Sequence, residues 1–333
     1  MSERGGQIQS ASPRAQTAAA AIGEAGGARL MSPMSLPPRL FDAARVRIHR
    51  ARAAKGFADA AFLHARAAED CADRLEEINR RFERAVVYGG GPALVSALSR
   101  RALREKLGAV FAADGTVALL GQGPRLACDP EAWPFAAQSL ELVVSLLTLH
   151  WANDLPGALV QARLSLKPDG LFLGVLFGAR TLQELRACLL AAEAEITGTA
   201  SLRVAPLVEI RDLGGLLQRA GFALPVTDAD LVTVRYATPL ALLQDLRGMG
   251  ETAAFAEAVP PLRRSVLLRA MALYQERFSD ADGRVRASFE LLTATGWAAH
   301  ASQQKPLAPG SAKASLAEAL GVREHSAGEK PAG

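Results

Sequence analysis

The feature that most constrains the fold is the segment at residues 86–92, Val-Val-Tyr-Gly-Gly-Gly-Pro. An apolar run that begins with two β-branched residues leads into three glycines and then a proline, which suits the first turn of a helix. Glycine has no Cβ, so a strand–glycine–helix turn lets backbone N–H groups approach a nucleotide-like ligand. The segment therefore predicts a ligand site at the carboxyl end of a parallel strand.

Strand-like and helix-like segments alternate around this turn. Strands are expected at residues 85–88, 109–113, 125–128, 140–147 and 171–177, and helices at 92–104, 155–166 and 181–196. The run at 140–147 is continuously apolar, as the central strands of a parallel sheet require. The alternation predicts a doubly wound, mostly parallel, Rossmann-like α/β sheet.

Helical patterns flank the expected sheet. We expect N-terminal helices over residues 38–84, the sheet domain over 85–238, and a C-terminal helical cap over 239–308 with helices at 239–249 and 261–278. The sheet domain is expected to close with a helix at 212–220 and a strand pair at 223–226 and 231–236. Residues 1–37 are expected to be disordered and residues 309–333 to form a flexible tail, because both are rich in small and polar residues.

Composition narrows the functional classes. The chain has 333 residues, 50 % of them hydrophobic, so it can bury a sizeable core. A net charge of only +4 and an aromatic content of 5 % disfavour a nucleic-acid-binding surface. Cys71, Cys128 and Cys188 form no CxxC pair, which indicates a reducing compartment. No apolar run approaches the roughly 20 residues that span a bilayer.

A basic run at residues 45–55 crowds the first expected helix, with Arg45, Arg47, Arg50, Arg52 and Lys55. The simpler interpretation is a solvated helix face. The alternative is a docking surface for an acidic partner or for a membrane, which would allow peripheral membrane association.

Two acidic residues follow expected strands near the glycine turn. Asp114 lies at a spacing from Gly89 that places a carboxylate where it can accept hydrogen bonds from ribose hydroxyls. Asp129 ends the third expected strand. Each feature has a structural alternative, because Gly, Asp-Gly and Asp-Pro are also common turn residues. Their joint occurrence favours a cofactor site.

The glycine turn, Asp114 and the segments at 129–135, 150–151 and 166–170 occur in the order found in class I S-adenosylmethionine-dependent methyltransferases. Residues 80–236 therefore resemble this class of protein. The resemblance implies that the glycine turn faces the methionine part of the cofactor, that Asp114 binds its ribose and that Asp129 contacts its adenine. It also implies that the end of the fourth strand lines the pocket. The implied cofactor-binding residues are Gly89, Gly90, Gly91, Asp114, Asp129 and Leu147.

A closer resemblance covers residues 39–308. The segments at 38–42, 149–156, 211–217, 295–297 and 302–306 resemble the methyltransferase-like proteins of the complex I assembly factor 5 group. The resemblance implies a role in assembling respiratory NADH dehydrogenase, with a subunit of that complex as client and hydroxylation of an arginine as the reaction. It also implies a location in the cytoplasm of a bacterium, at the inner membrane surface, or in the mitochondrial matrix of a eukaryote.

Two other functions stay open. The segment at 150–156 is shared with malonyl-acyl-carrier-protein O-methyltransferases of biotin synthesis, so an O-methyltransferase of a small molecule or an acyl carrier is the first alternative. Val87 stands where methyltransferases commonly carry an acid that holds the cofactor's ammonium. Losing that partner weakens S-adenosylmethionine binding by about 1–3 kcal/mol. A catalytically inactive scaffold is therefore the second alternative.

The histidines identify no metal site. None of the five is followed two residues later by Asp or Glu, the pattern common in Fe(II) oxygenases. His150 follows the fourth expected strand and is the one candidate general base. The alternative is that His150 and Trp151 form a pocket wall, and no other catalytic residue is assigned.

Overall fold

The computed structural model describes residues 39–303 and 321–322. The expectation of disorder at residues 1–37 lies outside the described residues, and so does the expected flexible tail at 309–333 apart from residues 321–322.

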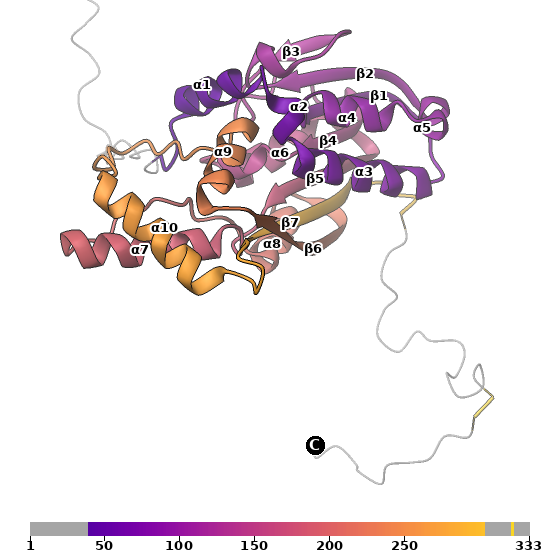
Figure 1. Cartoon of the computed structure of the whole chain (residues 1–333). Coiled ribbons are helices and arrows are strands. Elements are labelled where there is room, and N and C mark those ends of the chain that lie inside the picture. Colours follow the sequence, from indigo (N-terminus) through magenta and orange to yellow (C-terminus); the bar gives the residue numbers. More distant parts are fainter. Residues whose placement is uncertain (1–38, 304–320, 323–333) are drawn as a thin grey trace, which may run out of the picture. The chain divides into compact units, whose positions relative to one another are not determined.

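A seven-stranded sheet in the order β3-β2-β1-β4-β5-β7-β6 forms the centre of the fold (Figure 1). Its strands are β1 (Phe82–Gly89), β2 (Leu107–Asp114), β3 (Arg125–Ala127), β4 (Leu140–Leu146), β5 (Leu166–Phe177), β6 (Phe222–Tyr236) and β7 (Val285–Ala298). The first five strands are parallel, whereas β7 runs antiparallel to both β5 and β6. The predicted doubly wound, mostly parallel sheet is confirmed.

Helices cover both faces of this sheet. They are α1 (Ala43–Ala53), α2 (Phe57–Ala60), α3 (Phe62–Glu77), α4 (Gly91–Leu98), α5 (Arg101–Lys106), α6 (Leu155–Ser165), α7 (Gln183–Thr197), α8 (Ile210–Arg219), α9 (Pro239–Met249) and α10 (Arg264–Phe278). Two short 3₁₀ helices are η1 (Val117–Leu119) and η2 (Leu149–Trp151). Apolar residues of α3, α4, α7, α9 and α10 form one core, and those of α6 and α8 form the other. Strand β4 is almost wholly buried between them, which explains its unbroken apolar sequence.

The C-terminal region differs from the expected helical cap. Helices α9 and α10 are present, but residues 285–298 form β7, which inserts between β5 and β6. The expected strand pair at 223–226 and 231–236 is the single strand β6. The acidic residues Asp228 and Asp230 interrupt its apolar pattern, yet β6 lies at the sheet edge, where polar side chains reach solvent. The expected helical cap over residues 239–308 is therefore wrong for residues 285–298, which form β7.

Smaller differences occur elsewhere. The helix expected at 92–104 is divided into α4 and α5 around Ser99 and Arg100. The N-terminal helices end at Glu77, and β1 already begins at Phe82. The turn at 167–170 lies within β5 as an irregularity of its pairing with β4, and Asp169 there has a φ of 64°. None of these differences changes the order of the parallel strands.

The carboxyl ends of the parallel strands lie at one edge of the sheet, and the segments around α1 and α9 meet there. Phe41, just before α1, forms an isolated antiparallel bridge with Phe255. The backbone N–H of Asp42 donates to the carbonyl of Ala254 at 2.8 Å. The segment before α1 and the segment after α9 thus lie together at the edge at which this fold type binds its ligands.

Candidate functional site

The glycine turn has the local geometry that its sequence predicts. Gly89, Gly90 and Gly91 have φ values of 76°, 73° and 54°, a region that residues with a Cβ rarely adopt. A Cβ at Gly90 would lie 2.6 Å from the Leu146 side chain, so close packing against β4 also requires glycine. A Cβ at Gly91 would meet the ring of Phe57 at 3.1 Å. Gly91 therefore lies beneath Phe57 of α2, whereas Gly89 and Gly90 pack against the end of β4.

Asp114 ends β2 beside this turn and is 1 % exposed. Its Oδ1 accepts a hydrogen bond from the backbone N–H of Thr116 at 3.0 Å. Its Oδ2 accepts one from Nη2 of Arg50 at 2.8 Å, and the Arg50 side chain is also 1 % exposed. The carboxylate assigned to the ribose by sequence resemblance thus pairs with a guanidinium from α1.

Arg50 lies between two carboxylates. Its Nη1 is 3.8 Å from Oε1 of Glu251, the residue that follows the C-cap of α9. Burial lowers the pKa of Arg50. The neighbouring carboxylates of Asp114 and Glu251 raise this pKa by more than burial lowers it, so the net pKa lies above its ordinary value. Burial raises the pKa of Glu251, but His150 and Arg50 lower it below its ordinary value. Both groups are therefore charged at neutral pH.

Glu251 extends this network to the end of β4. Its Oε2 accepts a hydrogen bond from Nε1 of Trp151 at 2.8 Å and lies 2.9 Å from Nε2 of His150. The four side chains Arg50, Glu251, His150 and Trp151 therefore connect α1, the end of α9 and η2. Sequence reasoning missed the roles of Arg50 and Glu251, because neither lies in a motif that marks its tertiary partner.

The basic run on α1 divides accordingly. Arg45, Arg47, Arg52 and Lys55 are exposed, as the solvated-face interpretation expects. Arg50 is the exception, since its side chain points inward to Asp114. For this one residue the solvated-face interpretation is wrong.

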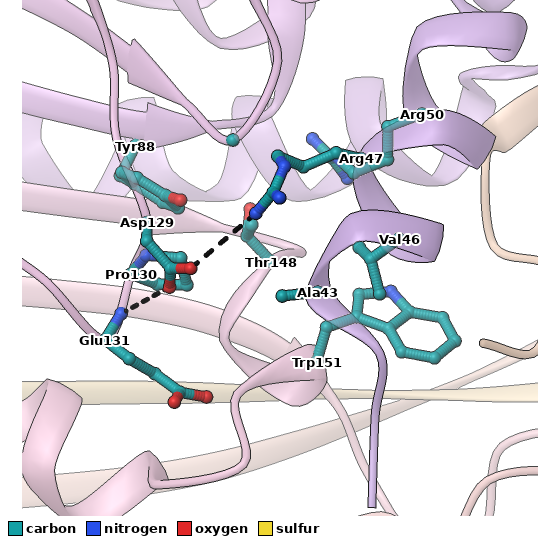
Figure 2. A pocket seen from close by; sticks show the side chains of 11 residues that line it. Ala43, Val46, Arg47, Arg50, Tyr88, Asp129, Pro130, Glu131, Thr148 and Trp151 are labelled. Atoms are coloured by element: carbon teal, nitrogen blue, oxygen red, sulfur yellow. Dashed lines mark hydrogen bonds and ion pairs between the residues drawn. The ribbon is translucent and has the colours of Figure 1, made fainter. Parts of the chain in front are cut away.

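A small cavity of about 40 Å³ remains at the carboxyl edge (Figure 2). Its lining includes Tyr88, Asp129, Thr148, Trp151, Arg47 and Arg50. Figure 2 shows Arg47 reaching from α1 toward Asp129, and their Nη1 and Oδ2 atoms are 3.8 Å apart. Asp129 Oδ1 accepts a hydrogen bond from the N–H of Glu131 at 2.9 Å. Asp114, Asp129 and the glycine turn thus lie around one edge.

Leu147, the remaining implied cofactor residue, follows β4 with a φ of 46°. It is fully buried, and its backbone N–H donates to the carbonyl of Val175 at 2.7 Å. Its side chain belongs to the hydrophobic core, and the lining of the cavity comes instead from the next residue, Thr148.

A larger cavity of about 450 Å³ adjoins the same edge. His150, Trp151 and Glu251 contribute to its wall, and Trp151 also lines the smaller cavity. The His150 ring packs against Phe177, with ring centroids 5.0 Å apart, and its Nδ1 has no hydrogen-bond partner within residues 39–303. The other lining residues are mostly apolar and come from β5, β7, α7, α9, the segment before α8 and the segment after α9. Arg203 and Arg247 are among them.

S-Adenosylmethionine does not fit the residues at the edge as they are arranged. The cavity of about 40 Å³ is far smaller than this cofactor needs, Asp114 is paired with Arg50, and Phe57 covers the glycine turn. Val87 is buried among apolar residues and supplies no partner for an ammonium. Within the described part of the chain, no group of three or more His, Cys, Asp or Glu residues could hold a metal ion.

Comparison with known proteins agrees with the fold. The family described as "Methyltransferase domain" matches residues 92–174. Together with the sheet order and the antiparallel β7, this match defines a protein of the class I methyltransferase fold. A solved putative methyltransferase from Bacillus halodurans aligns with a TM-score of 0.48 and 16 % identity, covering 70 % of this chain and 99 % of its own.

Curated relatives define the family. Arginine-hydroxylase NDUFAF5, mitochondrial, from Homo sapiens is 38 % identical over 254 residues, covering 74 % of this chain and 73 % of the relative. The Mus musculus protein of the same name is 37 % identical over 266 residues, covering 78 % and 77 %. A malonyl-[acyl-carrier protein] O-methyltransferase from Halorhodospira halophila is 31 % identical over 265 residues, covering 76 % and 86 %. The chain belongs to the methyltransferase-fold family that includes arginine-hydroxylase NDUFAF5.

Proposed function

We propose that this protein acts in the assembly of respiratory NADH dehydrogenase and hydroxylates an arginine side chain of a subunit of that complex. The observation that carries the proposal is the 37–38 % identity, over about three quarters of the chain, to relatives named arginine-hydroxylase. The relatives named as O-methyltransferases are less similar, at 31 % identity or below.

The larger cavity supports this substrate class. Its volume of about 450 Å³ lies within the roughly 300–1,000 Å³ typical of ligand sites, and it opens at the carboxyl edge of the sheet. Apolar residues such as Leu185 and Leu246 can pack against the methylene stem of an arginine. The carboxylate of Glu251 attracts its guanidinium, while His150 and Trp151 hold that carboxylate in place.

Two arginines also line this cavity and set the orientation of a client. Nη2 of Arg203 donates to Glu193 and its Nη1 to the carbonyl of Pro260, both at 2.6 Å, so its charge is already paired. Arg247 is exposed. A client arginine would therefore enter with its head directed toward Glu251 and away from Arg247.

We further propose S-adenosylmethionine as the ligand of the carboxyl edge, with Gly89, Gly90, Gly91, Asp114 and Asp129 as its contacts. The supporting observations are the methyltransferase match and the position of both acids at this edge. Because the present arrangement does not fit the cofactor, no chemical step is assigned to it. Val87 implies reduced affinity, and Leu147 contributes through its backbone position after β4.

The first test is a deletion strain carrying a plasmid copy of the gene. Complex I assembly on native gels should fail in the deletion and return with the wild-type copy. The tagged protein should co-purify with NADH dehydrogenase subunits, and mass spectrometry should find an added oxygen atom on one client arginine only in the complemented strain. Normal complex I assembly in the deletion strain would contradict the proposal.

The second candidate is a methyltransferase acting on malonyl-acyl-carrier protein or on a small acid, which the match to the Halorhodospira halophila enzyme favours. It predicts that the deletion strain requires biotin, and prototrophic growth argues against it. A scaffold without activity would restore assembly but leave the client arginine unmodified, so the same strains distinguish all three functions.

We propose that the protein works where the client subunits are made, in a bacterial cytoplasm or a mitochondrial matrix. The exposed arginines of α1 favour contact with an acidic client or with the inner membrane surface. No helix in the described residues is long and apolar enough to cross a membrane.

A further inference from the structure

Helix α9 and the residue after its C-cap place two opposite charges in the wall of the larger cavity. Leu243, Leu246 and Arg247 line the cavity from one face of α9, since residues three and four apart lie on the same side of a helix. Glu251, which follows the C-cap, also lines it. The Glu251 side chain is only 5 % exposed, whereas Arg247 is exposed. The cavity therefore has a buried carboxylate and a cation that reaches solvent.

The Arg247 guanidinium is available to a ligand of this cavity. The other charged side chains in the wall already have partners: Glu251 Oε2 lies 2.9 Å from His150 Nε2. Nη2 of Arg203 donates to Glu193 at 2.6 Å. Within residues 39–303, the Arg247 side chain makes no hydrogen bond or ion pair. A guanidinium offers five N–H donors in a planar fork that matches a carboxylate, so Arg247 can bind a carboxylate that the ligand supplies.

The charge of Arg247 opposes the entry of an arginine that has no acid beside it. In the proposed function a client arginine directs its guanidinium toward the buried Glu251, and it enters from the solvent, where Arg247 is exposed. Like charges brought together at an interface disfavour binding, whereas complementary charges favour it. A client with a carboxylate next to its arginine exchanges this repulsion for an ion pair.

Peptide geometry places such a carboxylate at the cavity entrance. An extended chain rises about 3.3 Å per residue, and side chains two residues apart point to the same side. An Asp or Glu close in sequence to the client arginine therefore remains at the entrance when the arginine is inside. Of the two arginines in the wall, Arg203 is 12 % exposed and already paired with Glu193. Arg247 is thus the cation that such an acid meets.

We propose that Arg247 determines client specificity by pairing with an Asp or Glu side chain within about three residues of the modified arginine. This inference rests on the proposed function, in which the larger cavity receives the client arginine. The client is recognised at two points, because Glu251 binds the cation and Arg247 binds the neighbouring acid. A cation in the last turn of α9 also stabilises the helix through its dipole. That effect alone leaves client modification independent of any acid in the client.

The first test is Arg247→Glu, with Arg104→Glu as the matched control. Both arginines are exposed and lie in the last turn of a helix, but Arg104, on α5, does not line the cavity. Each variant is expressed in the deletion strain, and thermal unfolding of the purified protein confirms that it is folded. Mass spectrometry measures how fast the client arginine gains oxygen after induction. We expect Arg247→Glu to slow this rate by at least about tenfold and the control to match wild type. A wild-type rate in Arg247→Glu overturns the inference.

The second test reverses the charge on the client. Each Asp and Glu near the modified arginine of the client subunit is replaced in turn by Lys. One client variant should be modified slowly by wild-type protein and should regain most of the rate with Arg247→Glu. Recovery in none of the client variants, or a modified arginine with no acid near it, overturns the ion pair. Failure of the proposed function is recognised separately, because the client arginine then stays unmodified even with wild-type protein, and that result overturns both.

Discussion

His64 is a buried histidine whose neutral form the fold requires. It lies on α3 with no exposed surface, and neither ring nitrogen has a hydrogen-bond partner within residues 39–303. Its ring packs edge-on against Phe57, with centroids 4.8 Å apart. Burial in these surroundings lowers the pKa of His64 from 6.5 to about 3.

The direction of the pH effect follows from the unfolded state. Below pH 6.5 the unfolded chain binds a proton at His64, whereas the folded chain does not until about pH 3. The stability that the neutral side chain permits is thus complete above pH 6.5 and decreases as the pH falls toward 3. At about pH 5 this linkage lowers the free energy of unfolding by about 2 kcal/mol.

His64→Leu removes this titration and fills the site with an apolar side chain. Urea unfolding monitored by circular dichroism, at about pH 7.5 and about pH 5, should show that wild type loses about 2 kcal/mol more on acidification than the variant does. His300→Leu, which replaces an exposed histidine, is the control. An identical acid-induced loss in wild type and His64→Leu would refute the reasoning.

Three further predictions concern Arg50, the glycine turn and the larger cavity. Arg50→Met should lower the free energy of unfolding by about 3–5 kcal/mol, because it leaves two buried carboxylates without their cation. Arg47→Met, on the exposed face of α1, should change it by less than about 1 kcal/mol. Equal urea midpoints for the two variants would contradict this prediction. Gly90→Ala should destabilise by about 3 kcal/mol, since its Cβ would clash with Leu146 at a positive φ, while Gly56→Ala, in open space, should be neutral or slightly stabilising by thermal denaturation. Ala253→Phe should narrow the larger cavity and reduce client arginine modification, with S-adenosylmethionine titration unchanged. Full modification in a complemented strain would exclude this cavity as the client site.

The parallel part of the sheet could be predicted from local patterns. The strand–glycine–helix turn and the continuous apolar run of β4 depend on residues close together in the chain, and their periodicity reports burial directly. Strand β7 could not be predicted in this way. Its sequence becomes a buried strand only because β5 and β6, far away in the chain, pair with its two edges.

The same division applies to the candidate site. Sequence by itself determined that Asp114, Asp129 and the glycine turn lie at the carboxyl edge, because strand order and spacing are enough to bring them there. Only the tertiary structure decided that Arg50, which lies in a run of otherwise exposed cations, pairs with Asp114 at 2.8 Å from 64 residues away. The state of a charged side chain depends on the neighbours that exclude water and neutralise it, and on α1 those neighbours come from β2 and from the end of α9.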